Sequence, residues 1–262
     1  MLILLSPAKA LDFGTPVARP ALSEPRLLDQ AQQLAAVMKS KTVAELAQLS
    51  AVSDEIAALN AQRWADFAVP FPPGAVRPAI LGFNGDAYQG MDARNRFGEA
   101  DFTEAQKTLR ILSGLYGVLR PLDAMLAYRL EMGTKLTTDR GRDLYQWWGD
   151  RITTLLAADL ADSPGAKTVI NLASKEYFSA VRPELLGGRV ISPRFEDTDA
   201  RGRRKVLSYY AKRARGEMTA WLILNRVRSP RGVVDFDGAG YRYDAASSTE
   251  AQPVFVRAFA DR

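Results

Sequence analysis

Lysines stand in short polar blocks that follow apolar, strand-like runs, and this pattern favours anion binding. Lys9 closes the block SPAK at residues 6–9, Lys175 lies in SKEY at residues 174–177, and Lys212 lies in YAKR at residues 210–213. A further block, NGD, occupies residues 84–86. Because ligands gather beyond the strand ends of α/β sheets, we expect these blocks to share one cleft. The alternative interpretation is that they are helix caps and turns. The residues predicted to line the basic cleft are Lys9, Arg129, Lys175, Lys212, Arg213 and Arg215.

Ser6 and Lys9 match the S-x-x-K pattern, in which a lysine one helical turn after a serine activates its hydroxyl. That activation requires the serine to begin a helix, whereas Pro7 and the preceding strand predict a loop here. The sequence therefore assigns no catalytic residue. The candidates for such a role are Ser6, Lys9, Lys175 and Tyr177.

Cysteine and histidine are both absent from the 262 residues. Their absence excludes disulfides, thiolate catalysis and Ser-His-Asp triads, and it removes the commonest metal ligand. An iron-handling protein would have to bind the metal through carboxylates such as Asp86 and Glu131. We expect no metal site and no cofactor.

Positive charge is concentrated in the last third of the chain. Residues 182–231 hold 13 Lys and Arg against 5 Asp and Glu, whereas the whole chain has a net charge of +5. Arginine outnumbers lysine 26 to 9, which suits bidentate contacts with phosphate. A solvated basic face is the ordinary explanation of such a run, and a polyanion partner is the functional one.

The elements predicted by apolar patterning alternate between strands and helices. Strands are expected at residues 2–6, 77–83, 167–172, 189–195, 203–210, 233–236, 241–243 and 254–259. Helices are expected at residues 24–40, 43–49, 53–67, 103–112, 118–126, 143–160 and 216–228. This order predicts a mixed α/β fold: one compact domain over residues 1–262, with a central mixed sheet surrounded by helices. The initial run MLILL is too short for a membrane span or a signal peptide, so we expect a monomeric cytoplasmic protein without membrane contact.

Two glycines, Gly114 and Gly117, separate the helices expected at 103–112 and 118–126. A helix, a glycine hairpin and a second helix would form a helix-hairpin-helix element at about 103–126, whose amides can contact DNA phosphates. A Schellman-type helix end between two core helices is the alternative. The residues predicted to contact DNA are Lys107, Arg110, Gly114, Leu115, Tyr116, Gly117 and Arg120.

Several blocks resemble the bacterial YaaA family of peroxide-stress proteins. They are LLSPAK (4–9), GDAY (85–88), SGLYGVLRPLDAMLAYRLEMG (113–133), LYQWWGD (144–150), NLASKEYF (171–178) and YYAKRARG (209–216). The resemblance covers nearly the whole chain. It implies a cytoplasmic protein that protects against hydrogen peroxide and restrains free iron. It also implies a DNA-binding helix-hairpin-helix beside a positively charged cleft.

Together with what the resemblance implies, the basic segment and the glycine hairpin predict a protein that binds duplex or branched DNA largely without sequence specificity and so limits iron-dependent oxidative damage. Tyr116 or Trp148 would stack on exposed bases. The alternative is an enzyme that acts on a small anionic substrate in the basic cleft, with Lys9, Lys175, Tyr177 and Lys212 as its site.

Overall fold

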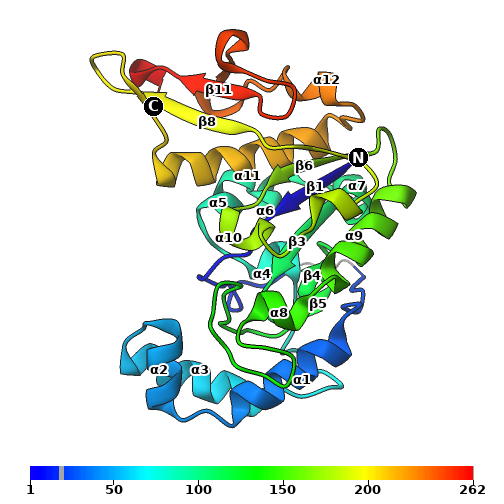
Figure 1. The fold of residues 1–262 in the computed structure, drawn as a ribbon, viewed down its shortest axis with the longest axis vertical. Coiled ribbons are helices and arrows are strands. Elements are labelled where there is room, and N and C mark those ends of the chain that lie inside the picture. Colours follow the sequence, from blue (N-terminus) through cyan, green and yellow to red (C-terminus); the bar gives the residue numbers. More distant parts are fainter. Residues whose placement is uncertain (18–20, 262) are drawn as a thin grey trace.

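A five-stranded mixed sheet forms the middle of the computed structural model, which describes residues 1–17 and 21–261 (Figure 1). The strands lie in the order β4-β3-β1-β6-β7, with β3, β1, β6 and β7 parallel and β4 antiparallel at one edge. The mixed α/β class and the central mixed sheet are therefore confirmed. The strands are β1 (Leu2–Leu5), β3 (Leu109–Ser113), β4 (Gly117–Leu119), β6 (Thr168–Leu172) and β7 (Arg189–Ile191).

Helices follow the expected pattern in the N-terminal third, where α1, α2 and α3 gather at one end of the molecule (Figure 1). Thr42 caps α2 in a capping box with Glu45, and Ser53 caps α3. Further along, the expected helix at 143–160 is divided at Gly149, which has φ +50°. These helices are α1 (Leu28–Lys39), α2 (Val43–Ser50), α3 (Asp54–Asp66), α8 (Leu144–Trp148) and α9 (Arg151–Asp162).

The helix-hairpin-helix prediction is wrong. After α7 (Glu99–Thr108), the chain continues as β3, a tight turn and β4, which pair as a β-hairpin, and then as β5 (Ala124–Met125). All five residues of β3, Leu-Arg-Ile-Leu-Ser, are buried. A strand buried on both faces carries no polar alternation, so its apolar spacing is indistinguishable from that of a buried helix.

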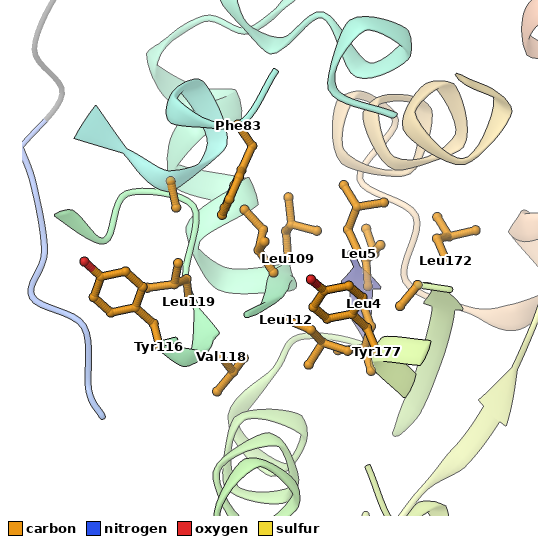
Figure 2. Packing of buried hydrophobic residues seen from close by; sticks show 14 of the residues in the cluster. Leu4, Leu5, Phe83, Leu109, Leu112, Tyr116, Val118, Leu119, Leu172 and Tyr177 are labelled. Atoms are coloured by element: carbon orange, nitrogen blue, oxygen red, sulfur yellow. The ribbon is translucent and has the colours of Figure 1, made fainter. Parts of the chain in front are cut away.

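The turn of this hairpin is sealed in the core. Leu115 and Tyr116 have no exposed surface, and Figure 2 shows Tyr116, Val118 and Leu119 among the buried apolar side chains. Trp148, also fully buried, donates its indole N–H to the Gly114 carbonyl over 3.0 Å. The hairpin therefore holds the sheet edge in place and does not face solvent.

A second, four-stranded sheet packs on the other side of helix α11 (Ser208–Leu224), in the order β10-β11-β8-β9 (Figure 1). Here the expected strand at 203–210 is wrong beyond Lys205, because α11 begins at Ser208, eight residues before the predicted helix start. The aromatic pair Tyr209–Tyr210 has strand propensity, yet it lies on the first turn of α11. The strands are β8 (Arg194–Thr198), β9 (Arg204–Lys205), β10 (Arg242–Tyr243) and β11 (Val254–Arg257).

Two other expected strands also differ. The run at 77–83 is β2 (Arg77–Pro78) followed by α4 (Ala79–Gly82), and β2 pairs with β5. The run at 233–236 follows α12 (Pro230–Val233) and forms no strand. Short helices complete the described chain: α5 (Asp86–Met91), α6 (Ala93–Arg96), α10 (Lys175–Phe178), η1 (Pro183–Leu185), η2 (Gly238–Gly240), η3 (Ala245–Ser247) and η4 (Phe259–Asp261). In the described residues, no helix is long and apolar enough to cross a membrane.

Candidate functional site

A pocket of about 390 Å³ lies beyond the carboxyl ends of the parallel strands β1 and β6. We call it the sheet-edge pocket. Its walls come from residues 5–10 after β1, the start of α5, the loop at 128–131, the residues after β6 and helix α11. Its position matches the expectation that polar strand exits meet at one rim of the sheet.

Ser6 ties the exits of β1 and β6 together. Its hydroxyl oxygen accepts the backbone N–H of Ser174 at 2.8 Å and lies 3.3 Å from the Ser174 hydroxyl, while the Tyr88 hydroxyl donates to the Ser6 carbonyl at 3.0 Å. Residues 6–10 form a loop, as expected, and the Lys9 ammonium is directed to Glu131 at 3.6 Å. The Ser6 hydroxyl is thus engaged with Ser174, and the Ser–Lys activation pattern gains no support.

Three tyrosines form a neutral floor beneath the pocket. Burial raises the pKa of Tyr88 and of Tyr128, and the Tyr128 hydroxyl lies 2.7 Å from the Ser113 hydroxyl. Burial also raises the pKa of Tyr177, with the nearby Tyr128 and Glu176 acting in the same direction. These phenols remain protonated at physiological pH and serve as hydrogen-bond donors rather than bases.

Glu131 lies at the wall of the sheet-edge pocket between two cations. Its Oε1 atom is 3.2 Å from Arg129 Nε and 3.6 Å from Lys9 Nζ, yet this buried oxygen has no hydrogen-bond partner in the described chain. On the opposite wall, Lys212 and Asp86 form a longer pair at 3.8 Å. Glu131 Oε1 is therefore a free acceptor for an N–H or O–H of a ligand.

Arg215 is the cation of this pocket without a compensating acid. Its side chain is half-buried, and burial alone lowers the pKa of Arg215. Throughout residues 1–17 and 21–261 its guanidinium has no ion pair or hydrogen bond. A partly desolvated, unpaired guanidinium favours a bound carboxylate or phosphate, to which it can donate two parallel hydrogen bonds.

The predicted basic cleft is divided by the structure. Lys9, Arg129, Lys212 and Arg215 line the sheet-edge pocket, whereas Lys175 lines a neighbouring cavity that also reaches Arg215. Arg213 lies elsewhere, with its guanidinium 5.9 Å from the Tyr209 ring centre. Lys212 lies on helix α11. The YAKR block therefore does not follow a strand as expected, although Lys212 still lines the pocket.

The residues predicted to contact DNA do not form one surface. Arg110 is buried and bonded to Asp159 through Nε at 2.5 Å, and Arg120 pairs with Asp123 at 2.9 Å. An added Cβ at Gly114 would clash with the Leu130 carbonyl group. Of this set, Lys107 alone is exposed. The remaining members, Leu115, Tyr116 and Gly117, are buried, and so is Trp148, so neither aromatic ring can stack on a base.

Sequence reasoning missed Glu176 as a structural part of the site, whereas Ser174 caps α10, as the cap interpretation of these blocks expected. Glu176 Oε1 accepts the Gly133 N–H at 2.9 Å and so fastens the loop that carries Glu131. Glu176 lies inside the SKEY block, so its position was signalled although its role was not. As for metals, no group of three or more acidic residues able to hold an ion occurs in the described parts of the chain, and Asp86 and Glu131 pair with cations instead.

A mixed α/β protein with a pocket lined by both cations and acids at the carboxyl edge of its sheet is the class that the fold and the site define. Residues 1–247 match the family model described as peroxide stress protein YaaA. The chain is also 47% identical over 258 residues to a protein of Idiomarina loihiensis, UPF0246 protein IL2146, covering 98% of this chain and 99% of that relative. The chain belongs to the YaaA family of peroxide stress proteins.

Proposed function

We propose that this peroxide stress protein is an enzyme that acts on a small anionic molecule in the sheet-edge pocket. The observation that carries the proposal is Arg215, a half-buried guanidinium without a counterion at the pocket wall. An anionic group of the substrate would pair with this guanidinium and replace the hydration that burial removes.

The remaining groups suit the body of such a substrate. Glu131 Oε1 offers a buried acceptor next to Lys9 and Arg129, which can accept an N–H or O–H of the substrate and fix its orientation. The rings of Tyr88 and Tyr177 and the apolar side chains that line the pocket would exclude water. The pocket volume of about 390 Å³ lies in the range of small-molecule sites.

The test compares Arg215→Gln with wild type in a bacterium that lacks its own family member. We expect Arg215→Gln to lose protection against hydrogen peroxide while its Tm stays close to that of wild type. Lys39→Gln, which removes an exposed cation at the end of α1, is the matched control and keeps protection. A folded Arg215→Gln protein that protects fully would refute the proposal.

DNA binding is the second candidate, now through a different surface. Arg201, Arg204 and Lys205 are exposed around β9. This strand belongs to the outer, four-stranded sheet and not to residues 103–126, where the DNA-binding element was predicted. Binding there would neutralise phosphates without reading sequence and, in the cytoplasm, would shield DNA from iron-dependent damage. Gel shifts over a salt series test it. The double variant Arg201→Ala with Lys205→Ala should lose two phosphate contacts, so the slope of log affinity against log salt should become shallower by about 2. A slope unchanged from wild type would remove this candidate.

A further inference from the structure

A second cavity, of about 460 Å³, adjoins the sheet-edge pocket and shares Arg215 with it. We call it the cationic chamber. It lies beyond the ends of β6 and β7 and is bordered by α10, β8 and α11. Three cations line it, Lys175, Arg194 and Arg215, and none of its described lining residues is acidic.

The positive charge of the chamber is only partly compensated. Arg194 pairs at 2.7 Å with Glu196, a residue that does not line the chamber. Lys175 Nζ, like the Arg215 guanidinium, has no ion pair or hydrogen bond in the described structure. Two uncompensated cations in one concave surface create a local positive potential that attracts an anion of more than one charge.

Neutral donors accompany these cations. The Asn171 amide donates to the Ser192 hydroxyl oxygen at 3.2 Å, which leaves the Ser192 O–H free to donate in turn. Gln252 adds an amide to the same lining. Cations together with hydroxyl and amide donors match a group that presents several acceptor oxygens.

The two cavities differ in character. The sheet-edge pocket combines acids, cations and a tyrosine floor, whereas the described lining of the cationic chamber holds three cations and no acid among neutral side chains. Arg215 stands at their common wall on α11. A planar guanidinium in this position can donate to the part of a ligand where the body joins the charged end.

We infer that the two cavities hold one elongated ligand, whose body lies in the sheet-edge pocket and whose multiply charged oxyanion end lies in the cationic chamber. The charged end is a diphosphate-like or polycarboxylate group bound by Lys175 and Arg215. The inference rests on the proposed function, because it assigns the substrate class of the same site.

Calorimetric titration with pyrophosphate, and separately with citrate, at constant ionic strength tests the chamber. Wild type should bind at least one of these probes, and the preferred probe identifies a phosphoryl or a carboxylate end. Lys175→Ala and Arg215→Lys should each weaken binding about tenfold or more. The first variant loses a charge-assisted contact, and the second keeps the charge but loses the two parallel hydrogen bonds of the guanidinium. Lys39→Ala should bind as wild type does. Failure of both probes to bind, or equal weakening by Lys39→Ala, overturns the inference.

Glu131→Gln separates this inference from the proposed function, because Glu131 lines the sheet-edge pocket and not the chamber. We expect this variant to bind the probe normally and to lose peroxide protection. If neither probe binds wild type while Glu131→Gln still abolishes protection, the chamber assignment falls and the proposed function stands. If the probe binds as expected while Glu131→Gln protects fully, the assigned role of the sheet-edge pocket falls instead.

Discussion

Gly216→Ala should loosen the contact that sets the width of the sheet-edge pocket. Helices α5 and α11 cross with a glycine on each side, Gly90 and Gly216. A Cβ at Gly216 would lie 2.7 Å from the Met91 nitrogen and still closer to the Ala87 carbonyl oxygen. Because ordinary contacts of a Cβ begin at about 3.4 Å, the Met91 contact alone requires about 0.7 Å of separation, and the nearer Ala87 carbonyl oxygen requires more.

The expected loss of stability follows from two opposing terms. Overpacking a tight contact costs about 3 kcal/mol when the obstacle is backbone. Alanine recovers about 1 kcal/mol, because glycine is the poorer residue inside a helix. The net loss is therefore about 2 kcal/mol, which corresponds to a fall in Tm of about 4–8 °C for a chain of this size.

Thermal unfolding followed by circular dichroism measures this loss. Gly14→Ala is the matched control, because its Cβ would meet no atom within 4 Å, and its Tm should stay within about 1 °C of wild type. If Gly216→Ala were as stable as wild type, the argument that the helices approach to glycine contact would be refuted.

Three further predictions concern buried polar groups. Asp159→Asn should lower the free energy of unfolding in urea by about 3–5 kcal/mol, because it leaves the buried Arg110 guanidinium without its carboxylate. Burial alone would raise the pKa of Asp159, but hydrogen bonds and charge from Arg26 and Arg110 outweigh it and hold the pKa below the ordinary 3.8. The stability from this ion pair is therefore present above about pH 4 and lost as pH falls through the lowered pKa, so urea midpoints of wild type and Asp159→Asn should converge in acid. Tyr128→Phe should cost about 1 kcal/mol in the same urea assay by removing the bond to the Ser113 hydroxyl, and a loss above about 3 kcal/mol would contradict that account.

The parallel strands at the site were predictable from sequence. The runs that became β1 and β6 are short, apolar and followed at once by polar residues, and each of these signals is local. Because the carboxyl ends of neighbouring parallel strands share an edge, the meeting of Ser6 with Ser174 followed from the topology.

The β3–β4 hairpin and the residue at which α11 begins were not predictable in the same way. The residues of β3 are buried on both faces, so no period distinguishes strand from helix, and Gly114 and Gly117 suit either kind of turn. The division of the basic residues between two cavities depends on which face of α11 each side chain occupies. Lys212 and Arg215 lie three residues apart on the wall of one pocket, whereas Arg213 points to Tyr209.

Helix α11 makes the two sheets interdependent. One side of it meets α5 and the central sheet, and the other meets β8. On this outer side the Trp221 ring packs on the ring of Phe236, which follows α12, with 5.9 Å between ring centres. Near its start, the Tyr210 ring lies 4.4 Å from the Arg257 guanidinium of β11. A shift of the outer sheet would therefore move helix α11, and with it the Arg215 guanidinium at the pocket wall. Substitutions in β9, β10 or β11 can alter ligand affinity without touching either cavity.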